Sequence, residues 1–312
     1  MGVPREHDPI PLREATTAAL AGEARLPEPA SPLVSALVPA YNEAETVEEV
    51  VRQLAALPLR TEIVVVNDGS VDGTAEALER LDRLHIPRLQ VIHHDRNRGK
   101  SAAIRTALAA SRGDVVVIQD ADLEYDPAEL PRLLKPILDG RADVVYGTRL
   151  RGGGEPQRAH LFWHYAGNRF LSLLTDVLYN TTISDMEVGY KAFRGELIRS
   201  IELVSDGFGF EPEVTAKLLR RGEVRLYELP IAYYGRTYTE GKKITWRDGL
   251  TALTLLVRYR FGPVGGKGGP PAGSGSAPRA VAAAPRVAAR LARAARTRPA
   301  RPSRPRPRGG GP

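Results

Sequence analysis

The sequence predicts an α/β protein with a mainly parallel β-sheet flanked by helices. Three observations predict it: short Val/Ile-rich runs recur from residue 33 onward, helical patterns separate them, and polar residues follow each run. Strands buried on both faces read as continuous apolar runs, and their alternation with helices is typical of βαβ units. Such sheets bind ligands at the carboxyl ends of their strands.

The first half of the chain shows this alternation most clearly. The expected strands are 33–38, 62–66, 89–93, 114–119 and 143–146, and the expected helices are 43–57, 72–84, 100–110 and 127–138. The first of these helices begins with acidic residues, which stabilise a helix N-terminus. After residue 149 the rhythm is lost, and we expect helices 161–179, 212–221 and 245–260 with strands 189–194 and 224–234 to complete the same domain.

Composition divides the chain into three parts. Residues 1–32 have no sustained period and predict a disordered leader with one short helix near 13–24. Residues 33–262 form the expected domain. Residues 263–312 are dominated by Gly, Pro, Ala and Arg and predict a disordered basic tail, in which 280–296 could form a basic helix on an anionic surface.

The charge is unevenly placed. The chain has 312 residues, no Cys and a net charge of +7, but eleven Lys/Arg lie between Val264 and Pro312, which leaves 33 Lys/Arg against 37 Asp/Glu in the rest. The absence of Cys excludes disulfides, thiolate metal sites and cysteine nucleophiles. The acidic body, and a tail almost without aromatic residues, disfavour nucleic-acid binding as the function. No apolar run is long enough to span a membrane, so we expect a cytoplasmic protein that at most lies on a membrane surface.

Two nucleotide-binding devices are missing where they would have to lie. The turn after the first strand, 39–43, contains no glycine, which excludes a dinucleotide-binding GxGxxG turn. Gly99-Lys100-Ser101 resembles the end of a P-loop, but His94 occupies the position of the required upstream glycine. A dehydrogenase and a P-loop enzyme are therefore disfavoured.

Three acidic residues follow the fourth expected strand. In extended backbone, Asp120, Asp122 and Glu124 share one face, so their carboxylates would converge at the strand's carboxyl end. Oxygen ligands without His or Cys suit Mg²⁺ or Mn²⁺. The alternative is a solvated acidic turn in which Asp126 caps the next helix.

A further acid, Asp68, ends the neighbouring strand. It could accept hydrogen bonds from a base or ribose, and Asp68-Gly69 also makes a turn before a helix capped by Ser70 or Asp72. The two roles are compatible.

Five stretches together resemble the family-two glycosyltransferases with a GT-A fold. They read VPAYNE (38–43), VVNDGS (65–70), NRGK (97–100), QDADLE (119–124) and YGTR (146–149). Further on, GNR (167–169), SDMEVGYKAFR (184–194), ELPI (228–231), Arg236 and Lys242 resemble the polyprenyl-phosphate sugar synthases, a group that includes the dolichyl-phosphate mannose synthases. The chain departs from the mannose synthases at 187–190, where Thr/Ser-Gly-Phe/Tyr-Arg is more usual. The resemblance covers about 33–261.

The resemblance implies a nucleotide-sugar site. Contacts with the nucleotide would come from Pro39, Tyr41, Glu43, Val66 and Asp68. The metal and sugar diphosphate would lie at Asp120, Ala121 and Asp122, with Asp120, Asp122 and Glu124 as metal ligands; Glu124 stands where the family often has Gln. The phosphates would be bound by Arg149, Arg236 and Lys242.

The implied reaction is the inverting, metal-dependent transfer of mannose or glucose from a GDP- or UDP-sugar to polyprenyl phosphate at the cytosolic membrane face. Such an acceptor is an anion and needs cationic docking, for which Arg169 and Lys243 are candidates, more than a strong base. If the acceptor were a carbohydrate hydroxyl, a carboxylate base would be required, and Asp185 or Glu187 is the candidate. We expect Asp122, Arg149 and Asp185 to be catalytic, although Asp185 could instead cap a turn. The loop 236–243 could close over the donor phosphates.

Overall fold

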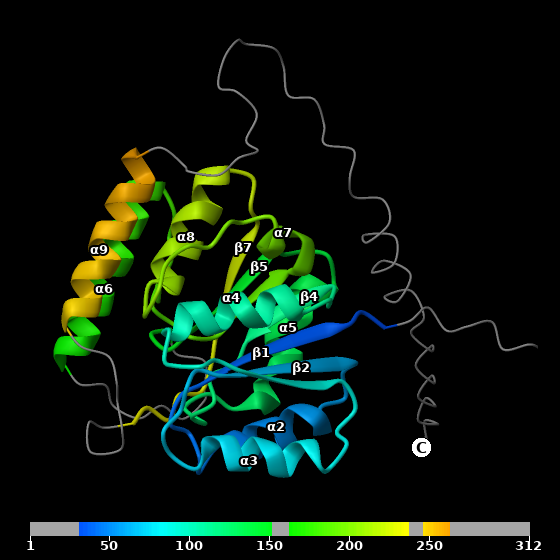
Figure 1. Cartoon of the computed structure of the whole chain (residues 1–312). Helices are drawn as coiled ribbons and strands as arrows, with labels where there is room; N and C mark the ends of the chain where they lie inside the picture. Colours follow the sequence, from blue (N-terminus) through cyan, green and yellow to red (C-terminus); the bar gives the residue numbers. More distant parts are fainter. Residues whose placement is uncertain (1–30, 152–161, 237–245, 263–312) are drawn as a thin grey trace, which may run out of the picture. The chain divides into compact units, whose positions relative to one another are not determined.

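Seven strands form one sheet in the computed structural model, which describes residues 31–151, 162–236 and 246–262 (Figure 1). Their order across the sheet is β3-β2-β1-β4-β6-β5-β7. The strands are β1 (Val34–Ala40), β2 (Thr61–Asn67), β3 (Leu89–His93), β4 (Val115–Ile118), β5 (Val144–Thr148), β6 (Lys191–Arg194) and β7 (Leu226–Pro230). The predicted α/β fold with a mainly parallel sheet is confirmed.

Eight α-helices accompany the sheet within the described ranges. They are α2 (Val47–Ala56), α3 (Thr74–Asp82), α4 (Lys100–Ala110), α5 (Leu130–Leu138), α6 (Phe162–Tyr179), α7 (Gly195–Arg199), α8 (Phe210–Arg221) and α9 (Trp246–Phe261), and a 3₁₀ turn, η1 (Pro127–Glu129), precedes α5. The short helix α7 was not predicted. The helices expected at 13–24 and 280–296, the leader and the tail lie outside the described residues.

The chain reverses its direction across the sheet beside β1. It runs outward from β1 through β2 to β3, and β4 then returns to pair with the other side of β1. Because parallel crossovers are right-handed, this reversal puts α4 on the opposite face of the sheet from α2 and α3, as Figure 1 shows. Such a reversal opens a crevice at the carboxyl ends of the strands.

The core lies on both faces of the central strands. All residues of β4 and β5 are buried, which explains their continuous Val-rich sequence. On α2 the buried residues Val47, Val50, Val51 and Leu54 have the spacing of one helix face. The hydrophobic core is therefore continuous from the first helices to the central strands.

Strand β6 lies between two strands that precede it in the chain. It runs antiparallel to both β4 and β5, whereas β7 pairs with β5 in parallel. The sequence predicted a strand in this region but not its position or direction. The insertion joins the second half of the chain to the first at the centre of the sheet.

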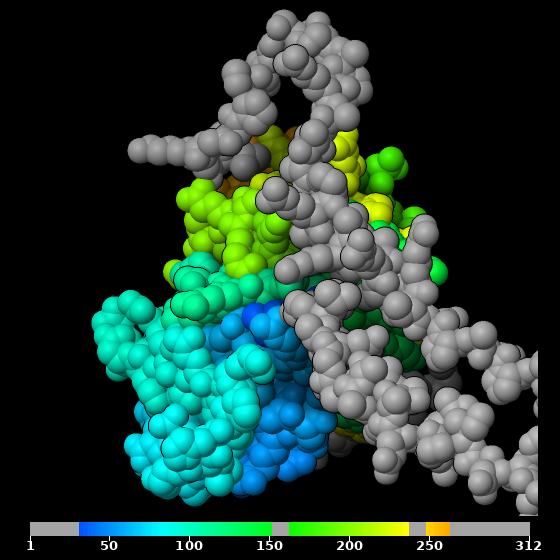
Figure 2. Space-filling model, turned by 90° about the vertical axis from the view of Figure 1, so that its right-hand side faces the viewer, coloured from blue at the N-terminus to red at the C-terminus, as the bar shows by residue number. Residues whose placement is uncertain are grey.

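Helices α6, α8 and α9 pack beside the sheet. Figure 1 shows α6 and α9 side by side, and the Tyr179 hydroxyl donates to the Leu256 carbonyl between them at 2.8 Å. In the space-filling view of Figure 2, the blue and cyan of the first half meet the light green of the second along the blue-green surface of α4. In the part of the chain that is described, no helix has the length and apolar character that crossing a membrane requires.

Candidate active site

A cavity of about 950 Å³ lies at the carboxyl ends of β1, β2, β4 and β5. Its wall includes polar and charged side chains of both halves of the chain, namely Glu43, Asp68, Lys100, Asp120, Asp122, Glu124, Arg149, Asn168, Glu187, Glu211 and Arg236. Trp163, His164 and Tyr165, from the first turn of α6, complete another part of the wall. The volume is at the upper end of the range for ligand sites.

The loops after β1 and β2 hold each other in place. Asn42 has a positive φ of 53°. Its side-chain Oδ1 accepts a hydrogen bond from the backbone amide of Val71, and its backbone amide donates to Ser70 Oγ. Asn tolerates this backbone conformation better than most residues. These contacts fix the edge of the cavity that Pro39, Tyr41 and Glu43 line.

Asp68 anchors the loop that precedes α4. Its carboxylate accepts hydrogen bonds from the amides of Arg98 at 3.0 Å and Gly99 at 2.7 Å, and it contacts His94 Nδ1 at 2.6 Å. Asp68 also lines the cavity. The structure therefore gives Asp68 a positioning role beside the predicted contact with nucleotide.

Lys100 joins two acids of the cavity. Its ammonium lies 2.8 Å from Asp120 Oδ1 and 3.1 Å from Glu211 Oε1. Burial lowers the pKa of Lys100, but the charges of Asp120 and Glu211 outweigh it and hold the pKa well above its usual range. This residue belongs to the GKS stretch that the sequence showed not to be a P-loop, and its role as a counter-ion was not predicted.

The three acids 120, 122 and 124 do not converge as predicted. Strand β4 ends at Ile118, and the following backbone turns, with a positive φ of 59° at Leu123. The alternation of an extended strand therefore does not apply, and among the described residues no three His, Asp or Glu side chains are arranged to hold a metal ion. The interpretation as one three-carboxylate face was wrong.

Glu124 is directed toward another part of the chain. Its carboxylate accepts hydrogen bonds from the Tyr233 hydroxyl at 3.0 Å and the Arg236 amide at 2.6 Å. The Arg236 guanidinium in turn contacts Glu43 Oε2 at 2.9 Å and donates to the Asp122 carbonyl at 2.6 Å. Glu124 thus fixes the segment that carries Arg236, which leaves Asp120 and Asp122 as the better candidates for a metal.

The charge around Asp122 suits a divalent cation. Burial, followed by the negative charges of Asp120 and Glu124, raises the pKa of Asp122 to about 7. A cation bound to Asp120 and Asp122 would relieve this repulsion, and carboxylate oxygens are the ligands that Mg²⁺ and Mn²⁺ prefer. The residues present therefore fit a metal held by two carboxylates.

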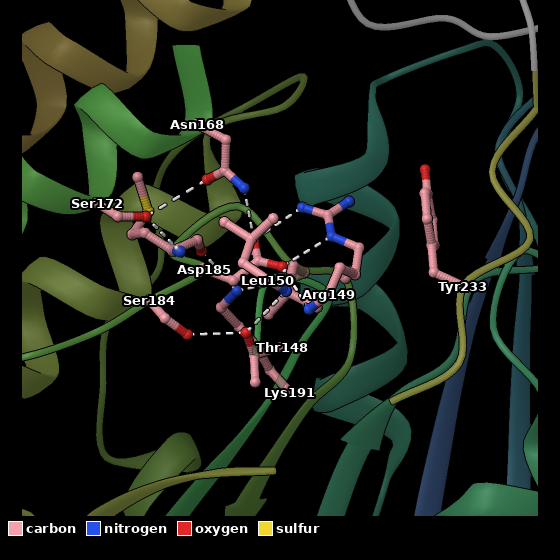
Figure 3. A network of polar contacts seen from close by, with 12 residues as sticks. Thr148, Arg149, Leu150, Asn168, Ser172, Ser184, Asp185, Lys191 and Tyr233 are labelled. Atoms are coloured by element: carbon pink, nitrogen blue, oxygen red, sulfur yellow. Dashed lines mark hydrogen bonds and ion pairs between the residues drawn. The ribbon is translucent and has the colours of Figure 1, made fainter. Parts of the chain in front are cut away.

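Arg149 is held in a fixed orientation across the cavity (Figure 3). Its Nε and Nη2 donate to the two oxygens of Asp185, both at 2.8 Å, and Asn168 donates to Oδ1 at 2.7 Å. The guanidinium also lies 5.0 Å from the centre of the Tyr233 ring, a cation–π distance. A bidentate pair of this kind fixes the plane of the guanidinium as well as its position.

Asp185 is not placed to act as a base. It is fully buried, and although burial raises its pKa, the charge and hydrogen bonds of Arg149 outweigh this and lower the pKa to about 2. Asp185 is also absent from the cavity wall. Its carboxylate is committed to Arg149, so the geometry favours a role in positioning the guanidinium over the predicted role as a base.

Other predicted residues lie apart from the cavity. Val66 is fully buried in β2, so its side chain packs in the core. Arg169 lines a separate pocket of about 210 Å³ with Arg151 and Asp176. Lys242 and Lys243 lie outside the described residues.

Tyr125 and Asn168 were missed by the sequence analysis. The Tyr125 hydroxyl accepts hydrogen bonds from the Gly189 amide at 3.1 Å and from Arg149 at 3.3 Å. Asn168 stood within the GNR stretch, and that stretch was the signal that could have identified it. No pattern marked Tyr125, because its partners lie far along the chain.

Comparisons with known proteins identify the family of the chain. Residues 35–201 match the model of the family described as glycosyl transferase family 2. The undecaprenyl-phosphate mannosyltransferase of Micrococcus luteus is 31% identical over 220 residues, which are 67% of this chain and 86% of that protein. The dolichol-phosphate mannosyltransferase of Pyrococcus furiosus is 30% identical over 213 residues, 67% of this chain and 58% of that protein.

Solved structures show the same fold. Glucosyl-3-phosphoglycerate synthase from Mycobacterium tuberculosis, in complex with UDP, has a TM-score of 0.59 at 21% identity, and the match covers 80% of this chain and 84% of that one. The same enzyme with Mn²⁺, UDP and phosphoglyceric acid has a TM-score of 0.58 at 21% identity, covering 80% and 82%. At this identity the likeness concerns the fold.

Proposed function

The chain belongs to glycosyl transferase family 2 and is a glycosyltransferase, and from this premise we propose that it transfers mannose or glucose from a GDP- or UDP-sugar to polyprenyl phosphate. The transfer inverts the configuration of the sugar and depends on Mg²⁺ or Mn²⁺. The names of the relatives from Micrococcus luteus and Pyrococcus furiosus support a polyprenyl-type phosphate acceptor.

One observation carries this proposal: two carboxylates and two guanidinium groups line the same cavity. Asp120 and Asp122 follow β4, Arg149 follows β5 and Arg236 approaches beside Asp122. A nucleoside diphosphate sugar carries two phosphates, which need cations, and its departure as a nucleoside diphosphate increases the negative charge there. An array of fixed charges stabilises such a transition state because it needs no reorganisation.

A divalent metal fits this array beside Asp120 and Asp122. When bound, it would neutralise the charge that grows on the departing diphosphate. The Mn²⁺ and UDP in the structure of the mycobacterial synthase support a divalent metal and a nucleoside diphosphate as the molecules bound in this cavity. Arg149, held by Asp185, and Arg236, held by Glu43, would bind the phosphate oxygens that the metal leaves free.

The acceptor phosphate needs no strong base, since it is an anion near neutral pH. This agrees with the geometry at Asp185, whose carboxylate is committed to Arg149. Docking of the acceptor instead requires a cation near the sugar. Arg149 lines the cavity, and Nη1 and Nη2 each keep one N–H that Asp185 and Tyr125 do not use, so its guanidinium can contact the acceptor phosphate as well as the donor diphosphate.

Helix α6 supports an acceptor carried in a membrane. Its first turn lines the cavity, and large apolar side chains at spacings of three, four and seven residues are exposed along it, namely Trp163, Phe170, Leu173 and Val177. On a helix these positions share one face. An exposed apolar stripe that begins at the cavity suits the surface of a bilayer at the cytosolic face, where the lipid part of the acceptor lies.

The test is a transfer assay with a lipid acceptor. Purified protein is incubated with radiolabelled GDP-mannose, GDP-glucose or UDP-glucose, a polyprenyl phosphate and Mg²⁺ or Mn²⁺. We expect a product that partitions into chloroform with one donor, and only with a divalent metal. Activity that survives chelation, or that persists in Asp122→Asn, would show that the assigned metal role is wrong.

The acceptor class is tested by the fate of the label. A water-soluble product formed only with a carbohydrate acceptor would replace the lipid acceptor by a hydroxyl acceptor. Association with membranes is measured separately by pelleting with anionic liposomes, comparing the full chain with residues 1–262. Equal pelleting of both would assign the attachment to the domain, and loss in the shorter chain would assign it to the basic tail.

A further inference from the structure

Glu187 differs from the other acids that line the cavity. The others have partners: Asp68 binds backbone amides, Asp120 and Glu211 pair with Lys100, Asp122 accepts from the Glu124 amide, Glu124 binds Tyr233 and the Arg236 amide, Glu43 pairs with Arg236, and Asp248 also has an interaction. Among the described residues, Glu187 Oε1 is buried and has no hydrogen-bond partner. A buried carboxyl oxygen that no protein group pairs with is stabilised by a hydrogen bond from a ligand, so this atom is a candidate contact for one.

The backbone that carries Glu187 is fixed on both sides. The buried Lys191 ammonium donates to the carbonyls of Met186 at 2.8 Å and Val188 at 2.5 Å, which flank Glu187. The Met186 amide donates to Ser172 Oγ at 3.0 Å, and the Gly189 amide donates to the Tyr125 hydroxyl at 3.1 Å. A side chain on so well-anchored a segment is presented to the cavity in a defined position.

The same segment lies against the predicted donor site. A Cβ atom placed on Gly189 would lie 2.4 Å from Asp120 Oδ2, so the backbone two residues after Glu187 passes directly beside the Asp120 carboxylate. Glu187 itself lines the cavity that contains Asp120. The sugar attached to a diphosphate at Asp120 would therefore lie within reach of this side chain.

The charges around Glu187 favour a neutral hydrogen-bonding partner over a cation or an anion. Burial and the charge of Glu211 raise the pKa of Glu187 to about 8, although Lys191 and Arg149 act in the opposite direction. Lys191 donates to backbone carbonyls and does not pair with Glu187. A carboxyl in this setting suits a sugar hydroxyl, which can donate to it or accept from it.

We propose that Glu187 recognises a hydroxyl group of the transferred hexose and so determines which sugar the enzyme uses. The inference rests on the proposed function. If the acceptor is polyprenyl phosphate, it carries no sugar hydroxyl, so the hydroxyl that bonds to Glu187 belongs to the hexose of the donor. The terminal torsion of a glutamate is broad, so the carboxyl can turn toward a hydroxyl in the cavity. The position is also one where the sequence departs from the mannose synthases.

The test measures donor binding without any acceptor. Dissociation constants of Glu187→Ala and Glu187→Gln are measured by calorimetry for the nucleotide sugar that the wild type binds and for the corresponding nucleoside diphosphate. We expect Glu187→Ala to weaken binding of the nucleotide sugar about 3- to 10-fold at pH 7, as the loss of a hydrogen bond between neutral groups implies, and to leave the nucleoside diphosphate unchanged. Equal weakening of both ligands, or of neither, overturns the inference.

Deoxy sugars identify the hydroxyl. One monodeoxy donor should bind the wild type about as weakly as the complete donor binds Glu187→Ala. The Glu187→Ala variant should bind that monodeoxy donor and the complete donor equally well. If the variant discriminates against every deoxy donor as the wild type does, the inference fails. The matched control is Asp176→Asn, another carboxyl whose pKa burial raises, which lies outside the cavity and should leave donor binding unchanged.

Stability separates recognition from a structural role. Because Glu187 Oε1 lacks a partner, replacement by Gln should leave the melting temperature unchanged or raise it, whereas a structural residue would lower it. The assay also separates this inference from the proposed function. If the wild type binds no nucleotide sugar, the proposed function fails; if it binds one and the Glu187 variants bind it equally well, only the role of Glu187 fails.

Discussion

Replacing Asp185 tests whether Arg149 must be held for catalysis. The pKa of Asp185 is about 2 in the folded protein, against an ordinary value of 3.8, because the Arg149 charge outweighs the effect of burial. This difference corresponds to about 2 kcal/mol of stability at neutral pH. We expect Asp185→Asn to lose about this amount and to reduce sugar transfer by about 100-fold, since a small displacement of a substrate-binding group has an effect of this size.

The chain offers a matched control at the opposite end of β5. Asp143 pairs with Arg194 at 3.1 Å and Arg225 at 2.9 Å, and these partners outweigh burial and lower its pKa to about 2 as well. It is absent from the cavity wall. Asp143→Asn should therefore lose a similar amount of stability and keep the rate of transfer at temperatures where both variants are folded.

The pH dependence gives an independent check. For an acid whose folded pKa is depressed, the stability is present above the unfolded pKa and is lost as the pH falls through the folded pKa. The difference in the free energy of unfolding between the wild type and either variant should thus be full at pH 7 and about half as large at pH 3. Urea unfolding at the two pH values measures it. If Asp185→Asn loses stability but transfers sugar at the wild-type rate, or if Asp143→Asn loses activity equally, the positioning role of Asp185 is refuted.

Three further predictions concern the metal and the donor. Gly189→Ala should weaken Mn²⁺ and donor binding, because the new Cβ would lie 2.4 Å from Asp120 Oδ2 and force that carboxylate to move; titration of each ligand measures it. The affinity for Mn²⁺ should fall about tenfold per pH unit below pH 7 and level off above it, since the pKa of Asp122 is about 7 and a metal must displace its proton; electron paramagnetic resonance of free Mn²⁺ measures it. Arg236→Ala should weaken donor binding at least about tenfold by removing a cation beside the diphosphate site, which calorimetry measures.

The two substitutions each have a control variant in the chain. Gly73→Ala adds a Cβ that lies 3.5 Å from its nearest neighbour, an ordinary contact, and should bind both ligands normally. Arg132→Ala removes an exposed arginine paired with Glu129 and should leave donor binding unchanged. A Mn²⁺ affinity that is constant between pH 5.5 and 7 would contradict the shifted pKa of Asp122, and unchanged donor binding in Arg236→Ala would exclude a phosphate contact.

Local patterns predicted the elements of the fold better than their pairing. Continuous Val-rich runs identified β2 and β4 because both faces of these strands are buried, and the helix α4 begins at Lys100 as expected. The antiparallel position of β6 depends on contacts with β4 and β5, which lie about fifty or more residues away in the chain. No local periodicity reports such pairing.

The candidate site was predicted only in part, because local motifs do not report contacts between residues far apart in the chain. The acids after β4 and Arg149 were identified because their motifs are local. The convergence of Asp120, Asp122 and Glu124 was wrong because the backbone leaves the extended conformation at Leu123. The bidentate pair of Arg149 and Asp185 joins residues 36 apart, and only the folded chain shows that the two side chains pair.

The insertion of β6 between β4 and β5 sets an order for folding. The strands β1 to β4 can pair with one another as soon as residue 118 is available, but β5 has no neighbour until β6 has been synthesised. During this interval the free edge of β4 is exposed, and such edges promote association between chains. Because the segment before β6 also carries Asp185 and Glu187, closing the sheet and completing the sugar site are one event. A nascent chain that stops before residue 194 would therefore be both inactive and prone to aggregate.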